Sequence, residues 1–250
     1  MNKRSVLITG CNGGIGRALC DHFIQQGWEV FGTDIQKLPG LDDQIHFYKF
    51  DLSKLSQIRK LEAVFAKNKY RLNCIINNAA FQVCKPFYDM EEHEWDAVFA
   101  INLKAPFFLI KQLFPFMDQN DGSVVNVGSV HAIATSDQIT AYATSKGALV
   151  TMTRALAIEL GKYHIRVNAI LPGATNTQML RDGLLRGHVE GTNEEELLAS
   201  LAEKHVLHRV GSVDEIAKAV YFLADLNQSS FVTGQSIVVD GGATIRLSTE

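Results

Sequence analysis

The chain has 250 residues, of which 46% are hydrophobic and 20% are charged, a composition that is ordinary for a globular domain and excludes disordered, collagen-like and low-complexity chains. Lysine and arginine total 24 against 27 aspartates and glutamates, which gives a net charge of −3. Because nucleic acids and anionic membranes are bound through clustered positive charge, neither is expected as the main partner.

Short apolar segments alternate with longer segments of helical periodicity along the chain. The short segments are rich in valine, isoleucine and phenylalanine, as expected for strands that are covered on both faces. This alternation predicts an α/β fold with a doubly wound, seven-stranded parallel sheet and helices on both faces. In chain order we expect strands at residues 6–9, 30–34, 46–51, 74–77, 123–128, 166–171 and 236–239, and helices at 15–26, 54–68, 91–118 with a break near 104–106, 141–163 and 213–226.

No linker, charge block or internal repeat divides the chain, so a single domain over residues 1–250 is expected. Residues 178–208 are polar and charged, and this stretch is expected to form a lid or substrate loop of that domain. The cysteines lack the spacing of a disulfide framework or a zinc site, and no stretch approaches the ~18 apolar residues of a membrane span. We therefore expect a soluble cytoplasmic protein with reduced thiols; the four cysteines are Cys11, Cys20, Cys74 and Cys84.

A glycine-rich turn, Thr9-Gly10-Cys11-Asn12-Gly13-Gly14-Ile15-Gly16, follows the first predicted strand and runs into a helix. Alone it is compatible with a simple tight connection, but its glycines also let the backbone approach a pyrophosphate, and the helix adds free N–H groups. Asp34 ends the second strand, eighteen residues after Gly16. A carboxylate there accepts hydrogen bonds from the adenosine ribose and repels the 2′-phosphate of NADP. The pattern predicts a dinucleotide site that prefers NAD, with Arg17 and Lys37 as the nearest cations.

Tyr142 and Lys146 are four residues apart in a predicted helix, so both side chains lie on one face. An ammonium about 4 Å from a phenol, at an effective dielectric of ~20, is worth roughly 4 kcal/mol, enough to lower the phenol pKa from ~10 to about 7. Ser129 stands at the carboxyl end of the fifth predicted strand, where doubly wound sheets bind ligands. We expect the serine hydroxyl and the phenol to converge on one substrate oxygen.

These motifs resemble those of the short-chain dehydrogenase/reductase family, in its compact single-domain branch. The resemblance covers nearly the whole chain and implies one NAD(P)-binding Rossmann domain. The visible departure is Ala80, where the family usually has glycine. The segments that carry the resemblance are Thr9-Gly10-x-x-x-Gly14-x-Gly16, Asn77-Asn78-Ala79-Ala80, the four residues Asn102, Ser129, Tyr142 and Lys146, then Pro172-Gly173-x-x-x-Thr177, and Thr233-Gly234-Gln235 to Asp240-Gly241-Gly242.

The resemblance also implies roles for single residues. Tyr142 exchanges a proton with the substrate oxygen while hydride passes to or from nicotinamide, and Ser129 polarises that oxygen. Lys146 lowers the pKa of Tyr142 and reaches the nicotinamide ribose, and Asn102 breaks its helix and holds a water linked to Lys146. No metal is expected, and the cofactor contacts implied are Gly10, Asn12, Gly14, Ile15, Gly16, Asp34, Ile35, Asp51, Leu52, Asn78, Ala79, Ala80, Tyr142, Lys146, Pro172, Gly173, Thr175 and Thr177.

The substrate pocket is expected to be walled by residues 81–88, 130–140 and 178–208, the loops beyond the strand ends. The charged lid has no long apolar face, which favours a small polar substrate such as a sugar, polyol or hydroxy acid. His131, two residues after Ser129, is either a contact to a substrate hydroxyl or carboxylate or an exposed loop histidine.

Three alternative functions are related to this one by their motifs or fold. A 3-oxoacyl-thioester reductase carries the same four catalytic residues and is expected to prefer NADPH, which Asp34 disfavours. A non-catalytic NAD-binding regulator is expected to have lost Tyr142 or Lys146, and a nucleotide-sugar epimerase needs a longer substrate domain. By resemblance we expect a homo-oligomer, a tetramer or dimer packed through the predicted helices at 91–118 and 141–163.

Overall fold

A seven-stranded sheet organises the molecule, whose structure is a computed structural model that describes residues 3–37, 39–40, 42–184 and 190–245. The strand order is β3-β2-β1-β4-β5-β6-β7, and every strand pairing is parallel. The predicted seven-stranded parallel sheet is therefore confirmed. The strands are β1 (Ser5–Thr9), β2 (Glu29–Asp34), β3 (Ile45–Lys49), β4 (Cys74–Asn77), β5 (Gly122–Val127), β6 (Ile165–Pro172) and β7 (Ser236–Val239).

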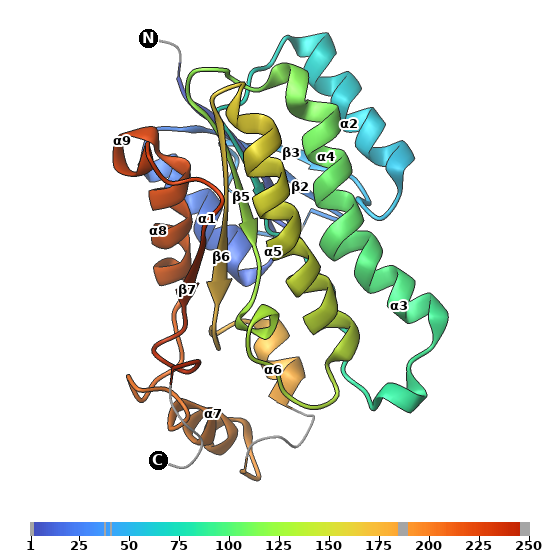
Figure 1. Cartoon of the computed structure of the whole chain (residues 1–250), viewed down its shortest axis with the longest axis vertical. Helices are drawn as coiled ribbons and strands as arrows, with labels where there is room; N and C mark the ends of the chain where they lie inside the picture. Colours follow the sequence, from blue (N-terminus) through green and yellow to red (C-terminus); the bar gives the residue numbers. More distant parts are fainter. Residues whose placement is uncertain (1–2, 38, 41, 185–189, 246–250) are drawn as a thin grey trace.

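Helices cover both faces of the sheet (Figure 1). One face packs against α1 and α8, and the other packs against α2, α4 and α5. The larger helices are α1 (Gly14–Gln25), α2 (Leu55–Asn68), α3 (Glu92–Phe99), α4 (Ala105–Leu113), α5 (Thr140–Gly161), α6 (Gln178–Leu184), α7 (Glu194–Ala202) and α8 (Val213–Ala224), and the shorter elements are η1 (Phe87–Asp89), η2 (Ala100–Lys104), η3 (Phe114–Phe116), η4 (Val130–Ala132) and α9 (Leu226–Ser229).

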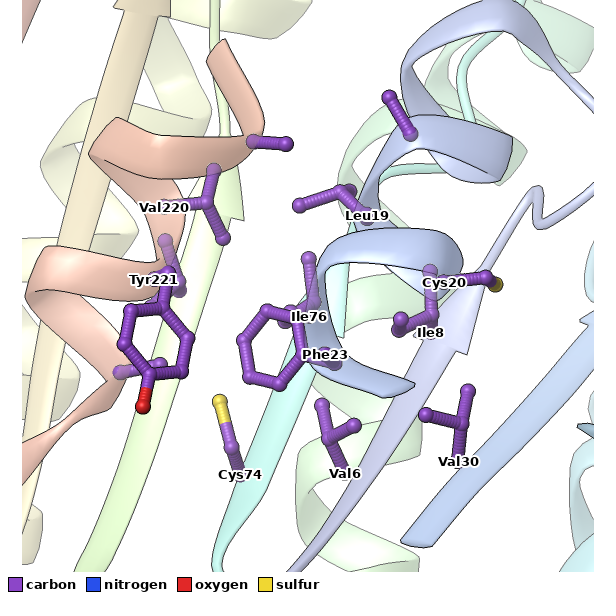
Figure 2. Packing of buried hydrophobic residues seen from close by; sticks show 14 of the residues in the cluster. Val6, Ile8, Leu19, Cys20, Phe23, Val30, Cys74, Ile76, Val220 and Tyr221 are labelled. Atoms are coloured by element: carbon purple, nitrogen blue, oxygen red, sulfur yellow. The ribbon is translucent and has the colours of Figure 1, made fainter. Parts of the chain in front are cut away.

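The layer between the sheet, α1 and α8 is a close-packed apolar core, shown in Figure 2. Phe23 of α1 packs edge-on against Trp28 and Tyr221, with ring centroids 5.1 and 5.2 Å apart. Val6 and Ile8 of β1 face the same layer and are fully buried. Between them, Leu7 faces the opposite core, beneath α2 and α4. Because both faces of β1 are buried, its central residues 6–8 are all apolar instead of alternating with polar residues.

A π-helical turn, η2, separates α3 from α4 and explains the break expected near residues 104–106. Pro106 lies in the first turn of α4, and it has no N–H to donate to the carbonyl of Asn102, four residues earlier. The irregular turn therefore lies just before the proline. This turn contains Asn102, whose side chain is buried.

Among the described residues, one helical stretch, Glu92–Phe116, has the length and apolar composition of a membrane span. Within it, Leu109, Ile110 and Leu113 are buried in the core between the sheet and α2. The apolar composition of this stretch is therefore that of a core helix.

The segment expected to be a polar loop, residues 178–208, contains two helices, α6 and α7, that lie beyond the carboxyl end of β6 (Figure 1). Asn193 caps α7, because its side chain accepts a hydrogen bond from the backbone N–H of Glu196 at 3.0 Å. Leu184 of α6 and Leu201 of α7 are buried in a small apolar cluster of their own. This mostly charged segment therefore contains a short apolar face. Residues 185–189 of the segment lie outside the described part of the chain.

Candidate active site

A cleft of about 1350 Å³ runs along the carboxyl ends of the strands and under α6 and α7. Every cofactor contact predicted from the sequence lines this cleft, and so do Ser129, Tyr142 and Lys146. Asn102 is the one predicted site residue that does not line it. The cofactor-contact residues found along the wall are Gly10, Asn12, Gly14, Ile15, Gly16, Asp34, Ile35, Asp51, Leu52, Asn78, Ala79, Ala80, Tyr142, Lys146, Pro172, Gly173, Thr175 and Thr177.

The turn between β1 and α1 requires glycine for steric reasons. Gly10 has φ +65°, and a Cβ there would lie 2.9 Å from the Cα of Ala79. A Cβ on Gly16 would lie 2.0 Å from the carbonyl oxygen of Gly10. Gly13 precedes α1 and offers no side-chain cap, so the first N–H groups of this helix remain available to the oxygens of a phosphate. The turn fits a pyrophosphate for these reasons.

Asn78 ties the end of β4 to this turn. Its side-chain amide donates hydrogen bonds to the carbonyl oxygens of Thr9 at 2.9 Å and Gly10 at 3.1 Å. The backbone N–H groups of Asn78 and Ala79 donate to the hydroxyl of Thr9 at 3.0 and 2.9 Å. These bonds hold the backbone of residues 78–80 against the cleft, where Ala80 lies in place of the family's glycine.

Asp34 presents a fixed carboxylate at the adenosine end of the cleft. Its Oδ2 accepts a hydrogen bond from the backbone N–H of Asn12 at 3.0 Å, and its Oδ1 accepts one from Ile35 at 2.7 Å. Each oxygen keeps a second lone pair, so the carboxylate can accept the two hydroxyls of an adenosine ribose. This pair of acceptor oxygens fits the adenosine ribose of a nicotinamide dinucleotide.

The two cations near Asp34 are engaged elsewhere. Arg17 donates from Nε to the carbonyl oxygen of Asn12 at 3.0 Å and from Nη2 to that of Pro39 at 2.9 Å. Lys37 pairs with Asp43 at 3.9 Å. Neither cation is among the residues along the described wall of the cleft.

Three side chains gather at the other end of the cleft, where β5 and α5 meet. Ser129, Tyr142 and Lys146 are 7%, 7% and 1% exposed. The Ser129 side chain hydrogen-bonds the phenol of Tyr142. Lys146 donates from Nζ to the carbonyl oxygen of Val127 at 2.8 Å, and this nitrogen lies 5.5 Å from the centre of the Tyr142 ring. The predicted convergence of the serine hydroxyl and the phenol is therefore present.

The expectation that Lys146 lowers the pKa of Tyr142 is wrong for the chain alone. Burial raises the pKa of Tyr142 to about 12, and the hydrogen bond from Ser129, which acts in the opposite direction, does not offset it. Burial also lowers the pKa of Lys146 to about 7, so this group is only partly charged at neutral pH. Desolvation sets the direction of both shifts, because burial disfavours the charged form of each group.

Asn102 is a positioning residue in this structure. Its Oδ1 accepts a hydrogen bond from the backbone N–H of Phe81 at 2.8 Å. Its Nδ2 donates to the carbonyl oxygen of Phe81 and to the hydroxyl of Ser145, both at 2.9 Å. The Ser145 hydroxyl in turn donates to the carbonyl oxygen of Tyr142 at 2.7 Å. The side chain thus joins the loop after β4 to α5 and uses all its hydrogen-bonding groups except one lone pair.

The loop after β6 forms another wall of the cleft. Thr175 donates its hydroxyl to the carbonyl oxygen of Gly173 at 3.1 Å, and Thr177 donates to that of Thr175 at 3.2 Å. The Thr177 hydroxyl also accepts a hydrogen bond from the backbone N–H of Leu180 at 3.2 Å, in the first turn of α6. This chain of bonds fixes the lid to the strand end that it follows.

The three segments expected to wall the substrate pocket all contribute, but two contributions were missed. His131 lines the cleft with its ring edge-on to Tyr142, with 6.1 Å between the ring centroids. It is therefore partly buried beside the catalytic tyrosine and is not a fully exposed loop histidine. One missed wall is α3 with the following turn, whose cleft-lining residues share one helical face; the other is the turn after β7. The missed residues include His93, Asp96, Ala97, Ala100, Ile101 and Ala243. Their spacing along residues 93–101 is the only sequence signal that pointed to them.

Known proteins with similar sequences support this architecture. A family model described as Enoyl-(Acyl carrier protein) reductase matches residues 10–244. The 3-oxoacyl-[acyl-carrier-protein] reductase of Thermotoga maritima is 34% identical over 249 residues, covering 96% of this chain and 97% of that protein. A Rhizobium meliloti protein named "Probable galactose dehydrogenase" is 33% identical over 255 residues, covering 97% of this chain and 95% of that protein.

A solved structure agrees with the same assignment. The ligand-free aldohexose dehydrogenase of Thermoplasma acidophilum superposes with a TM-score of 0.91 at 28% identity, covering 99% of this chain and 96% of that one. The matching family model spans nearly the whole chain, and the relatives are similar over their full lengths. The chain belongs to the short-chain dehydrogenase/reductase family and is an NAD(P)-dependent oxidoreductase that acts on CH–OH groups.

Proposed function

We propose that this protein uses NAD to oxidise a hydroxyl of a small polar substrate, such as a sugar, polyol or hydroxy acid, and catalyses the reverse reduction. The observation that carries this proposal is the arrangement of one cleft. Ser129, Tyr142 and Lys146 lie together at one end, and the carboxylate of Asp34 lies at the adenosine end. The bound nicotinamide would supply the hydride acceptor or donor.

The side chains at the catalytic end would handle the substrate oxygen and its proton. Ser129 donates a hydrogen bond to that oxygen and holds it near the phenol of Tyr142. Because burial keeps the pKa of Tyr142 at about 12, the phenol is protonated at neutral pH and is ready to donate to a carbonyl oxygen. Oxidation needs the phenolate, whereas reduction uses the protonated phenol. The oxidation rate should therefore increase with pH more steeply than the reduction rate.

The preference for NAD rests on Asp34. Its carboxylate lines the cleft and has lone pairs for the ribose hydroxyls, whereas a 2′-phosphate in their place would meet the same negative charge. Arg17 and Lys37, the cations that would counter this repulsion, are bonded to Pro39 and Asp43. Relative kcat/KM values for NAD and NADP test this part of the proposal.

A polar substrate is favoured by the side chains around the catalytic end. Five polar side chains line the cleft, and one of them, His131, has its ring edge-on to Tyr142; the five are Gln82, His93, Asp96, His131 and Ser136. Met179, Leu180 and Leu201 also line it, so the wall is mixed and suits a molecule with a carbon skeleton and several hydroxyls. The similarity to proteins named for galactose and aldohexose oxidation agrees with this class.

A second candidate, reduction of a 3-oxoacyl thioester, is favoured by the 34% identity to the Thermotoga maritima reductase. The two functions are separated by one panel. NADH formation is measured with sugars, polyols, hydroxy acids and simple secondary alcohols, and NADH and NADPH consumption is measured with an acetoacetyl thioester. Turnover of hydroxylated compounds with NAD supports the first function, whereas efficient thioester reduction with NADPH alone would replace it with the second. Tyr142→Phe is the control that identifies background rates.

The remaining expectations concern the setting of this activity. We propose one cytoplasmic NAD-binding domain, with residues 178–208 as its substrate lid, that forms a dimer or tetramer through α4 and α5. Phe107 on α4 is 41% exposed and Ile158 on α5 is 83% exposed, which supports an apolar contact between copies. Light scattering tests the assembly, and a stable monomer would contradict it.

A further inference from the structure

A buried histidine lies in the wall of the cleft on the lid side. His205 follows α7, is 3% exposed, and lines the same cleft as Ser129 and Tyr142. Within the described part of the chain no group of acidic, histidine and cysteine side chains could hold a metal ion, so metal binding does not account for it. A polar ring that is this deeply buried requires partners for both nitrogens.

One ring nitrogen is satisfied and the other is not. Nδ1 lies 2.9 Å from the carbonyl oxygen of Leu201, one turn earlier. A carbonyl oxygen only accepts, so Nδ1 carries the proton, and in the neutral ring Nε2 is left as an acceptor. Nε2 is buried and has no hydrogen-bond partner among the described residues. The protein thus holds an unsatisfied acceptor at the border of its cleft, at a cost in stability.

The turn after β7 holds this ring in place. Asp240 accepts hydrogen bonds from the backbone N–H of Gly242 at 2.9 Å and of Thr244 at 2.8 Å, which closes the turn. Leu207 donates its N–H to the carbonyl oxygen of Gly241 at 3.1 Å. A Cβ added to Gly241 would lie 3.6 Å from Cδ2 of His205, so the ring lies beside this turn. The turn and the bond to Leu201 therefore fix the place of the ring.

We propose that Nε2 of His205 accepts a hydrogen bond from a substrate hydroxyl other than the one held by Ser129 and Tyr142. This inference rests on the proposed function and deepens it, because it makes the substrate a polyhydroxy compound of the sugar or polyol class. A bound hydroxyl would satisfy the buried acceptor, and an analogue without that hydroxyl would leave it unpaired. Sites of this kind discriminate strongly against the analogue that lacks the polar group.

The test uses D-galactose and D-glucose as probes, together with their 2-, 3-, 4- and 6-deoxy forms. For each protein the discrimination ratio is kcat/KM for the parent sugar divided by kcat/KM for the deoxy sugar. This ratio does not depend on the fraction of folded enzyme. Wild type is expected to discriminate by tenfold or more against one deoxy form.

Two variants separate recognition from structure. In His205→Asn the amide nitrogen replaces Nδ1 and keeps the bond to Leu201, but nothing replaces Nε2. In His205→Gln the amide replaces Nε2 and the bond to Leu201 is lost. The proposal predicts that the asparagine variant loses the discrimination against that one deoxy sugar and that the glutamine variant retains most of it. If the asparagine variant does not fold, the glutamine variant alone decides, because loss of its discrimination overturns the proposal.

The outcomes also distinguish this inference from the proposed function. If wild type oxidises the sugars and both variants reduce kcat/KM equally for every sugar, His205 is only structural and the inference is overturned while the function stands. If wild type oxidises hydroxy acids but neither aldohexose, the function again stands and the inference is overturned. If wild type oxidises no hydroxylated compound with NAD, both are overturned.

Discussion

Replacing Asp34 with asparagine should shift the cofactor preference from NAD towards NADP. The two oxygens of Asp34 each accept one backbone N–H, at 3.0 and 2.7 Å, and each has a lone pair left for one ribose hydroxyl. Asparagine keeps one oxygen, so one charge-assisted hydrogen bond to NAD is lost, which is worth about 1.5 kcal/mol. Since each ~1.4 kcal/mol is tenfold, kcat/KM for NAD should fall by roughly tenfold.

The same substitution removes a repulsion against NADP. A phosphate with close to two negative charges beside a partly exposed carboxylate is opposed by about 2 kcal/mol after solvent screening. Its relief raises kcat/KM for NADP by roughly 30-fold. The ratio of the two kcat/KM values should therefore change by about 300-fold in Asp34→Asn.

The assay is initial-rate NADH or NADPH formation with one substrate at a fixed concentration and each cofactor varied. Asp89→Asn is the matched control, because it removes the same charge from an exposed side chain that does not line the described wall of the cleft. The control should keep the wild-type ratio. A wild type that prefers NADP, or an Asp34→Asn ratio within threefold of wild type, would refute the reasoning.

Three further predictions concern stability and binding. Asn102→Ala removes three hydrogen bonds, two to the partly buried backbone of Phe81 and one to the buried hydroxyl of Ser145, and should lower the unfolding free energy by about 3 kcal/mol in urea denaturation; a loss below about 1 kcal/mol would contradict its positioning role. Burial lowers the pKa of Lys146 to about 7, so the folded state binds fewer protons than the unfolded chain above that pH, and stability increases with pH. Between pH 7 and pH 9 wild type should gain about 2 kcal/mol relative to Lys146→Met, and parallel pH profiles would refute this. Gly16→Ala should abolish NAD binding in calorimetry, because its Cβ would lie 2.0 Å from the carbonyl oxygen of Gly10, whereas Gly147→Ala, with nothing within 4 Å, should bind NAD as wild type does.

The sheet and the glycine turn could be predicted because their causes are local. Strands buried on both faces are mostly apolar, as the central residues 6–8 of β1 and the pair Val124-Val125 of β5 are. A left-handed turn with close backbone contacts allows only glycine, and Gly10 and Gly16 show both constraints. These requirements leave marks in a single sequence.

The properties of the candidate site that were missed depend on contacts between distant segments. Asn102 is 21 residues from Phe81 and 43 from Ser145, so its role as a link between loop and helix leaves no local pattern. The pKa of Tyr142 was expected to be lowered, but it is raised. The spacing places Lys146 on the same face of the helix but says nothing about how deeply both groups are buried.

The lid shows a related difficulty. The segment contains many charged residues, so its composition led to the expectation of a loop. The leucines on one face of α7, including the buried Leu201, were overlooked for this reason. The buried position of His205 follows from packing against the turn at Gly241, 36 residues further along the chain. Neither feature has a signature that composition or spacing reveals.

The central claim, hydride transfer with Tyr142 exchanging the substrate proton, is tested most directly by comparing wild type with Tyr142→Phe. NADH formation at 340 nm is measured with the hydroxylated panel, and NAD binding to each protein is measured by calorimetry. The phenyl ring fills the same space without a proton to exchange, so turnover should fall by at least about a thousandfold while the Kd for NAD stays within about threefold. Retained turnover in Tyr142→Phe, or no turnover of any hydroxylated compound by wild type, would contradict the account.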